Sequence, residues 1–238
     1  MNDIKILTNS LDSFGIKYSD DQIKQLYKYY EMLVEKNSVM NLTAITDFEG
    51  VMMKHFVDSL AILKYINIPD GSKVMDIGTG AGFPGIPLKI ILPNVEFVLL
   101  DSINKKLNFI REVVDELKLE KIDVIHSRAE DLAHIKEYRE KYDLVFSRAV
   151  ANLSTLTELS MAFIKKNGYF IPYKSALVDD EVSKASNAIR LMGGKLEKIE
   201  KFKLPGNSEE RNFVFIRKGV NTPSTYPRKA GTPSKKPL

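Results

Sequence analysis

The 238-residue chain predicts an α/β fold with a mostly parallel sheet, helices on both faces of the sheet and a helical extension at the N-terminus. Three observations support this prediction. From residue 73 onward, short apolar runs of strand length alternate with helical stretches. The first 70 residues carry helical periodicity and no competing strand pattern. A glycine-rich segment, residues 78–85, separates the first apolar run from the next helical stretch.

The N-terminal third is predicted to form three helices. Leu7 and Leu11 lie four residues apart, as on one buried helix face. Ser19 is a suitable N-cap for a second helix, because its side-chain oxygen can accept a bond from a backbone N–H group. Thr46 or Asp47 can cap a third helix in the same way. We expect residues 1–70 to form a helical cap that packs on the sheet.

The central part of the chain, residues 71–218, is predicted to form a Rossmann-like sheet domain. Its apolar strands are expected at 74–77, 95–100, 122–125, 144–146 and 169–171, with helices at 103–117, 153–164 and 177–192. Continuous apolar strands are typical of a parallel sheet that is buried on both faces. Residues 196–202 and 212–217 flank a turn-rich loop, so we expect a final hairpin and one antiparallel strand. Within that hairpin, Leu196, Ile199 and Phe202 recur every third residue, which is not a clean strand pattern.

The last segment, residues 219–238, differs in composition from the rest of the chain. It contains four basic residues and no acidic one, so the remainder is neutral within the formal net charge of +4. Four prolines lie among threonine, serine, glycine and lysine. We expect a flexible basic tail, which either binds RNA phosphates or is an inert disordered terminus.

Composition excludes several classes of protein. The chain has no cysteine, which rules out thiolate catalysis, disulfides and thiolate-bound zinc. His55, His126 and His134 lack a close ligand spacing, so we expect no metal site. No apolar run approaches the roughly 20 residues that span a bilayer, and the N-terminus lacks a signal sequence. We expect a cytoplasmic protein that acts as a monomer, away from membranes.

The glycine-rich segment predicts a cofactor site. Residues 78–85 follow Asp76 and read Gly-Thr-Gly-Ala-Gly-Phe-Pro-Gly, which permits a tight turn and close approach of a ligand. The stretch from Gly80 to Gly85, with Asp101 about 20 residues further on, also fits a nicotinamide dinucleotide site. However, a carboxylate at Asp76 would repel a pyrophosphate, whereas it could pair with a methionine ammonium directly or through water. We therefore favour S-adenosylmethionine, with Asp101 accepting bonds from ribose hydroxyls.

A third acidic position follows the third predicted strand. Ligand-binding loops cluster at this end of a doubly wound sheet. The backbone amide of Ala129 and the carboxylate of Glu130 could therefore bind an adenine edge. Alternatively, Glu130 and Asp131 only begin a helix, where acidic residues are favoured.

Four further segments make the pattern specific to one family. Together with the glycine segment, and in the same order and spacing, they resemble the bacterial RsmG family, also called GidB, from about residue 20 to the C-terminus. The segments are Asn37-Ser38-Val39-Met40-Asn41-Leu42-Thr43, Lys54-His55-Phe56-Val57-Asp58-Ser59-Leu60, Phe146-Ser147-Arg148-Ala149-Val150 and Pro227-Arg228-Lys229-Ala230-Gly231-Thr232-Pro233.

The resemblance implies a Rossmann-like class I methyltransferase fold and an activity. Members of the family transfer methyl groups to guanine N7 in the RNA of the small ribosomal subunit. The expected partner is therefore 16S rRNA or the small subunit, with the target guanine in the decoding-region loop. The donor contacts that it implies are Gly78, Phe83, Ala129, Glu130 and Arg148, to which the residues themselves add Gly80 and Asp101.

The residue inventory is compatible with methylation of guanine N7. Methylation of pyrimidine C5 needs a cysteine nucleophile, which is absent. Methylation of an exocyclic amine uses Asp/Asn-Pro-Pro-Tyr after the fourth strand, where this chain has residues 147–150, Ser-Arg-Ala-Val. Guanine N7 has an in-plane lone pair and loses no proton, so positioning is the main requirement and no general base is expected.

The remaining candidates have two interpretations each. Arg148 pairs with a carboxylate or an RNA phosphate or stacks on a base, or else forms a plain salt bridge to Glu130 or Asp101. Asn41, His55 and Asp58 line the substrate side, or they fix the helical cap on the sheet by hydrogen bonds. Lys174 and Arg211 contact RNA phosphates, or they are solvated surface charges.

Two other functions compete with methyl transfer. A nicotinamide-dependent oxidoreductase would be supported by a Tyr-x-x-x-Lys pair, but no tyrosine here has a lysine four residues later. A non-catalytic RNA-binding or assembly protein could retain a vestigial donor pocket, although the intact segment from Asp76 to Gly82 favours an enzyme.

Overall fold

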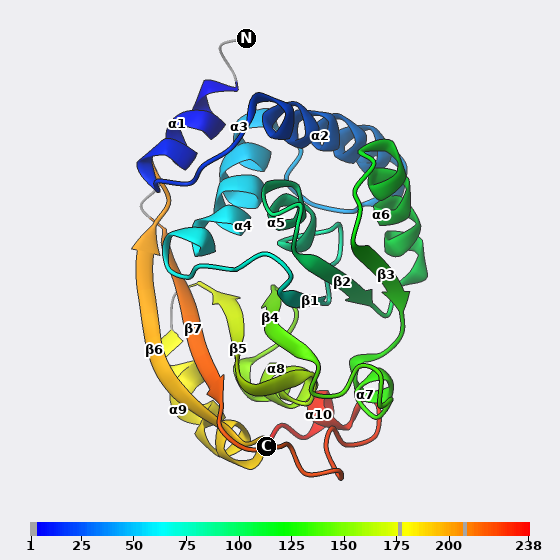
Figure 1. The fold of residues 1–238 in the computed structure, drawn as a ribbon, viewed down its shortest axis with the longest axis vertical. Helices are drawn as coiled ribbons and strands as arrows, with labels where there is room; N and C mark the ends of the chain where they lie inside the picture. Colours follow the sequence, from blue (N-terminus) through cyan, green and yellow to red (C-terminus); the bar gives the residue numbers. More distant parts are fainter. Residues whose placement is uncertain (1–3, 176–177, 207–208) are drawn as a thin grey trace.

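The computed structural model describes residues 4–175, 178–206 and 209–238, which form a seven-stranded sheet in the order β3-β2-β1-β4-β5-β7-β6 (Figure 1). Strands β1 to β5 pair in parallel, whereas β7 is antiparallel to both β5 and β6. The predicted single antiparallel strand is therefore confirmed. The strands are β1 (Lys73–Ile77), β2 (Glu96–Asp101), β3 (Ile122–His126), β4 (Tyr142–Arg148), β5 (Ile164–Lys174), β6 (Gly194–Lys203) and β7 (Glu210–Lys218).

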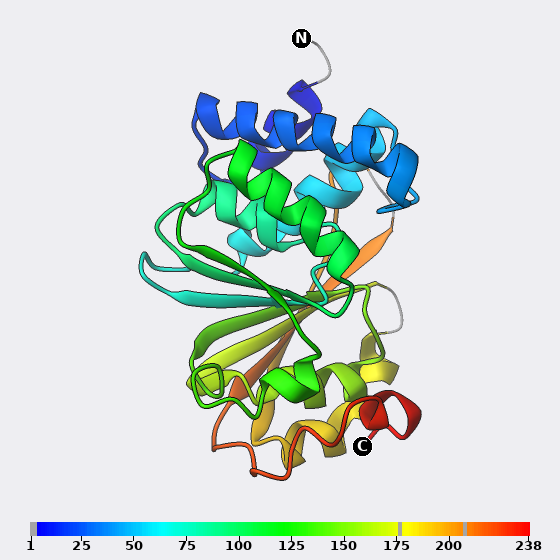
Figure 2. The same cartoon turned by 90° about the vertical axis from the view of Figure 1, so that its right-hand side faces the viewer.

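Helices cover both faces of the sheet, as Figure 2 shows with the sheet seen nearly edge-on. One layer holds α1 (Lys5–Ser13), α2 (Asp20–Met40), α3 (Phe48–Val51), α4 (Asp58–Leu60), α5 (Gly85–Ile91) and α6 (Asn104–Glu116). The opposite layer holds α7 (Ala129–Leu132), α8 (Leu153–Met161), α9 (Val178–Leu191) and α10 (Thr232–Lys235).

The sheet packs against two hydrophobic clusters, one on each face. Each strand contributes to both, because side chains alternate between the two faces of a sheet. Val74 of β1 belongs to the cluster under the N-terminal helices, whereas the next residue, Met75, belongs to the cluster under α8 and α9. Phe97 and Val98 of β2 divide in the same way. The central strands are therefore buried on both sides, as their continuous apolar runs predict.

The helical cap follows the predicted capping signals. Ser19 begins α2 with a capping box, in which Ser19 and Gln22 bond each other's backbone N–H groups. Asp47, and not Thr46, caps the next helix by accepting from the Gly50 N–H at 2.7 Å. The third predicted helix is not uniform, because α3 continues as a π-helix, η1 (Met52–Val57), then α4, then a 3-10 helix, η2 (Ala61–Lys64). A π-segment widens the helix locally and is often found at functional sites.

The irregular spacing near the C-terminus has a structural cause. Leu196 pairs with Ile216 of β7 and Lys198 pairs with Phe215, so the register shifts at the residue between them. Such a bulge adds one residue to one strand and interrupts the alternation of side chains. The three-residue interval between Leu196 and Ile199 is therefore a bulged strand and not a helical pattern.

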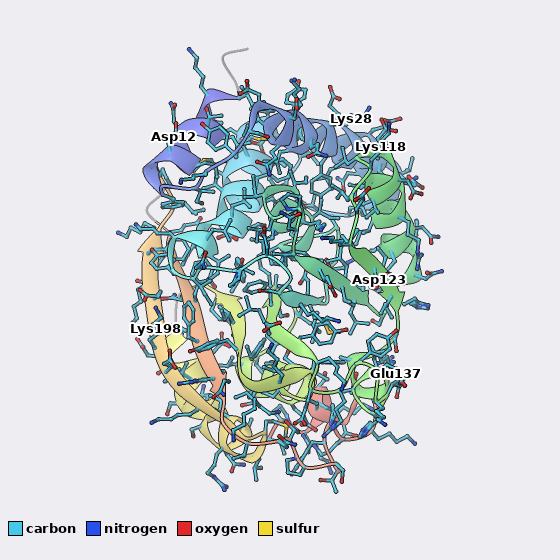
Figure 3. All side chains as sticks on the ribbon, viewed as in Figure 1. Asp12, Lys28, Lys118, Asp123, Glu137 and Lys198 are labelled. Carbon is cyan, nitrogen blue, oxygen red and sulfur yellow. The ribbon has the colours of Figure 1, made fainter. Side chains whose placement is uncertain are left out.

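The segment 219–238 packs on the α7 and α8 side of the sheet, which differs from the expected flexible tail. Arg228 forms an ion pair with the buried Glu158 of α8, and Pro233 is buried. Glu158 therefore binds one of the four bases that were expected to be free. Composition alone does not reveal this ion pair. The other three bases of this segment, Lys229, Lys235 and Lys236, are exposed, as are Lys28, Lys118 and Asp123 on the rim of the molecule (Figure 3). Among the described residues, no helix has the length and apolarity needed to cross a membrane.

Candidate active site

The glycine segment forms a bend between β1 and α5. Gly78, Gly80 and Gly82 have φ values of 69°, 60° and 102°, a region that other residues rarely adopt. Asp101, at the end of β2, accepts from the Gly80 N–H through Oδ2 at 2.9 Å and from the Ile103 N–H through Oδ1 at 2.9 Å. This carboxylate therefore ties the glycine bend to the loop that follows β2.

Asp76 lies behind this bend and does not line the pocket in front of it. Its Oδ2 accepts from the Thr79 hydroxyl at 2.6 Å and from the Gly85 N–H at 3.0 Å. Its Oδ1 has no hydrogen-bond partner among the described residues, and burial raises the pKa of the carboxyl group to about 6. Asp76 thus braces the loop through Oδ2, and its expected pairing with a ligand ammonium group, directly or through water, stays a prediction.

A pocket of about 480 Å³ opens in front of the bend, at the carboxyl ends of β1 to β4. In a doubly wound sheet, this edge is where ligands bind. All seven residues predicted to bind the cofactor contribute to its wall: Gly78, Gly80, Phe83, Asp101, Ala129, Glu130 and Arg148. His55 and Thr43 of the helical cap complete one side of it.

Arg148, the last residue of β4, connects the sheet to the helical cap. Its Nη1 lies 2.8 Å from Asp58 Oδ2 and donates to the Lys54 carbonyl oxygen at 3.1 Å. Its guanidinium carbon lies 5.1 Å from the centre of the Phe83 ring. The carboxylate partner of Arg148 is thus Asp58, and not Glu130 or Asp101 as in the salt-bridge alternative.

His55 packs between these groups. Its ring stacks on Phe83 with 4.6 Å between ring centres, and its Nε2 lies 2.8 Å from the Thr43 hydroxyl. Its Nδ1 lies 3.3 Å from Arg148 Nη2. Burial and the neighbouring Arg148 lower the pKa of His55 to about 4, so the ring is neutral at physiological pH. These contacts, with those of Asp58, fit the interpretation in which both residues fix the cap on the sheet.

A second pocket of about 230 Å³ adjoins the first and shares Arg148 and Ala149 with it. Asp58, Lys174 and Arg211 line this second pocket. Arg211 Nε lies 3.2 Å from Asp58 Oδ1, so one buried carboxylate holds two arginines. Ala149 has a φ of 56°, which is uncommon for a residue with a side chain.

Lys174 and Arg211 are not solvated surface charges. Lys174 Nζ pairs with Glu181 Oε2 at 2.7 Å and donates to the Ala151 carbonyl oxygen at 2.9 Å. The side chains of Lys174 and Arg211 are only 10% and 18% exposed. Asn41 lines neither of these two pockets and caps the C-terminus of α2 in a left-handed conformation, with a φ of 49°.

Glu130 both begins a helix and lines the larger pocket, so its two expected roles are compatible and the adenine contact stays a prediction. It lies in the first turn of α7 with Asp131, and its buried side chain lines the larger pocket. Its Oε1 accepts from the backbone N–H of Gly231 at 2.8 Å. Sequence reasoning did not identify Ser234, which also lines this pocket, because nothing local indicates that the C-terminus returns to it. Glu181, which lines the second pocket, was not predicted either, since it resembles any acidic residue in the first turn of a helix.

Solved structures share the fold over part of this chain. TYW2 from M. jannaschii, in complex with AdoMet, aligns with a TM-score of 0.52 and 14% identity, over 63% of this chain and 70% of that chain. At this identity the likeness establishes the fold alone.

Full-length relatives are much closer in sequence. The protein named ribosomal RNA small subunit methyltransferase G of Lachnoclostridium phytofermentans is 47% identical over 100% of this chain and 98% of its own length. The protein of the same name in Desulforamulus reducens is 48% identical over 100% of both chains. Residues 22–214 match the family described as GidB, rRNA small subunit methyltransferase G. From this match and from these relatives, the chain belongs to the rRNA small subunit methyltransferase G family.

Proposed function

We propose that this protein transfers the methyl group of S-adenosylmethionine to N7 of a guanine in the 16S rRNA of the small ribosomal subunit. One observation carries the proposal: seven residues at or shortly after the carboxyl ends of four strands meet in one pocket, in a chain of this family. We further propose that the protein acts in the cytoplasm as a monomer.

The residues of the larger pocket fit the methyl donor. A Cβ atom added to Gly80 would meet only the Gly78 carbonyl oxygen, at 3.9 Å, so the glycine leaves a space that a ligand can enter. Asp101 retains lone pairs for ribose hydroxyls, because each carboxylate oxygen accepts one bond within the chain. Phe83 offers an apolar wall, and Glu130 offers a buried acceptor.

Bound there, S-adenosylmethionine supplies an electrophilic methyl group on a positively charged sulfur. The chain has to hold the acceptor nitrogen in line with that methyl group, which is catalysis by positioning. Guanine N7 attacks with its own lone pair, so no residue must remove a proton. A neutral His55 and an Arg148 that is paired with Asp58 limit the positive charge at the site.

We place the acceptor base in the smaller pocket. Arg148 and Ala149 form the boundary between the two pockets, so a base in the second lies next to a donor in the first. Lys174 and Arg211 would bind RNA phosphates there. Each would keep its ion pair within the chain, Lys174 with Glu181 and Arg211 with Asp58. The helical cap, residues 1–70, supplies Asp58 to this pocket and so contributes to the acceptor side.

Methyl transfer to ribosomal particles tests the activity. Purified protein and labelled S-adenosylmethionine would be incubated with small subunits from a strain that lacks the gene, and with naked 16S rRNA. We expect label in 7-methylguanosine at one position after digestion of the RNA. Label in another nucleoside, or binding of NAD in place of S-adenosylmethionine by calorimetry, would overturn the proposal.

Two arginine variants test the site. Arg148→Ala removes a side chain that borders both pockets, and we expect at least a tenfold loss of methyl transfer. Arg190→Ala is the matched control, because Arg190 is exposed on α9 and, within the described part of the chain, its side chain bonds Asn187 alone. Full activity of Arg148→Ala would remove this residue from the mechanism.

A further inference from the structure

After β7, the chain leaves the sheet and runs along α7 and α8 (Figures 1 and 2). We call residues 222–238 the C-terminal strap. At its root, the buried Thr222 donates its hydroxyl to the Met192 carbonyl oxygen at 2.8 Å and its N–H to Glu140 Oε1 at 2.8 Å. Arg139 donates to the carbonyl oxygens of Thr222 and Tyr226 at 2.8 and 3.0 Å. The strap therefore starts from a hydrogen-bonded anchor.

An ion pair fixes the middle of the strap. Glu158 of α8 is completely buried, and Arg228 Nη2 and Nε lie 2.6 and 2.9 Å from its two oxygens, Oε2 and Oε1. The Arg228 N–H also donates to Glu158 Oε1, at 2.8 Å. A buried carboxylate is costly without such partners, and the paired geometry of arginine and carboxylate fixes orientation as well as charge. Arg228 thereby determines where the next residues lie.

The end of the strap reaches the larger pocket. Three residues after Arg228, the Gly231 N–H donates to Glu130 Oε1 at 2.8 Å. The Thr155 hydroxyl of α8 donates to the Pro233 carbonyl oxygen at 3.0 Å, and the next residue, Ser234, lines the pocket. The strap thus contacts one acidic wall residue and contributes a second wall residue itself.

The geometry points to a role for the strap in binding the methyl donor: we propose that Arg228, through Gly231, positions Glu130 to bind the adenosine part of S-adenosylmethionine. The inference rests on the proposed function, because it takes the larger pocket as the donor site. It makes Arg228 a positioning residue, since Arg228 touches Glu158 and not the pocket.

Glu130 has one oxygen left for a ligand. Oε1 is held by Gly231, whereas Oε2 makes no hydrogen bond within the described part of the chain. A fixed carboxylate oxygen in a pocket wall is a suitable acceptor for the amino group of an adenine. The strap bond restrains the rotation of Glu130, so less side-chain entropy is lost when the ligand binds.

This role differs from that of a basic arm for RNA. An arm would act through the charge of its bases, so every base would contribute and the effect would fall with salt. Arg228 forms an ion pair with the buried Glu158. The neighbouring Lys229 is exposed and makes no ion pair within the described residues, 4–175, 178–206 and 209–238. The two residues carry equal charge, differ in contacts and are adjacent, so they form a matched pair.

Calorimetry of S-adenosylmethionine binding to the full chain, without RNA, tests the proposal. We expect Arg228→Ala to bind about tenfold more weakly, since it loosens a bond to a charged group, and Lys229→Ala to bind as the wild type does. Arg228→Lys, which keeps the charge, should recover part of the loss. Equal affinity in the wild type and Arg228→Ala would overturn the proposal. A wild type that does not bind S-adenosylmethionine would instead overturn the proposed function.

A double-mutant cycle separates positioning from general damage to the fold. If Arg228 acts through Glu130, Arg228→Ala should have little further effect on donor affinity in a Glu130→Ala background. If Arg228→Ala only destabilises the protein, its effect should be the same in both backgrounds. An undiminished effect in the Glu130→Ala background would overturn the positioning role.

Hydrogen exchange of the unmodified protein gives a test that needs no variant. Binding linkage is reciprocal, so a strap that favours donor binding must itself be stabilised by the donor. We expect peptides covering residues 228–234 to exchange more slowly when S-adenosylmethionine is added, by about the same tenfold factor. Unchanged exchange in these peptides, with protection at the glycine bend, would refute the strap's role.

Discussion

Asp76→Asn is predicted to change how the stability of the protein depends on pH. Asp76 is completely buried behind the glycine bend, and one of its oxygens has no partner among the described residues. Asparagine has nearly the same shape and keeps an acceptor for the Thr79 hydroxyl and the Gly85 N–H. It carries no charge at any pH. The substitution therefore removes the titration of this site with little change in packing.

The sign of the effect follows from the pKa of Asp76, which burial raises from 3.8 to about 6. Below pH 3.8 the carboxyl group is protonated in both the folded and the unfolded chain, and its neutral form is tolerated in the core. As the pH rises through 6, the unfolded chain has already released this proton, whereas the folded chain must bury a charge. The wild type should thus lose about 3 kcal/mol of unfolding free energy between about pH 4 and pH 7, relative to Asp76→Asn.

His55 titrates in the opposite direction, with its pKa lowered from 6.5 to about 4. It favours the folded state above pH 6.5, and this contribution is lost as the pH falls towards 4. Because His55 is present in both proteins, its contribution cancels when the wild type and Asp76→Asn are compared. The difference between the two proteins therefore reports Asp76 alone.

Urea unfolding at several pH values between 4.5 and 7.5 measures the effect. The free energy of unfolding of Asp76→Asn minus that of the wild type should increase with pH. Asp115→Asn is measured alongside as the control for the substitution itself, because Asp115 is exposed on α6. If the difference for Asp76→Asn is flat across this range, then Asp76 is ionised in the folded protein as easily as in water, and the reasoning fails.

Three further substitutions separate stability from binding. Gly85→Ala would place a Cβ atom 2.3 Å from Leu99 Cδ2, so we expect a loss of roughly 3 kcal/mol in chemical unfolding, and unchanged stability would contradict the close packing. Gly80→Ala meets no such neighbour, and we expect it to cost only about 1–2 kcal/mol for its positive φ but to weaken S-adenosylmethionine binding at least tenfold by calorimetry. Retained affinity would argue against ligand approach at Gly80. Asp58→Asn leaves Arg148 and Arg211 without a buried counter-charge. We therefore expect the free energy of unfolding, measured by thermal unfolding, to fall by roughly 3–5 kcal/mol. A wild-type melting curve would show that the ion pairs are dispensable.

Local signals predicted the elements well and their irregularities poorly. Ser19 and Gln22 form the expected capping box because both partners lie within one turn. The bulge at residue 197, by contrast, depends on where β7 pairs with β6, and only its broken periodicity is visible in the sequence. The π-helix of residues 52–57 has no signal that composition or spacing could reveal.

For the site, the sequence by itself determined which residues meet in the larger pocket, because Gly78, Asp101, Glu130 and Arg148 each lie at or shortly after the end of a recognisable strand. Parallel strands bring their carboxyl ends to one edge, so knowing the strands is enough to bring these residues together. The partners of these residues were decided only by the tertiary structure. Arg148 and Asp58 are 90 positions apart, and Glu130 and Gly231 are 101 apart. Periodicity extends over a few turns of one element, whereas such contacts depend on how separate elements pack.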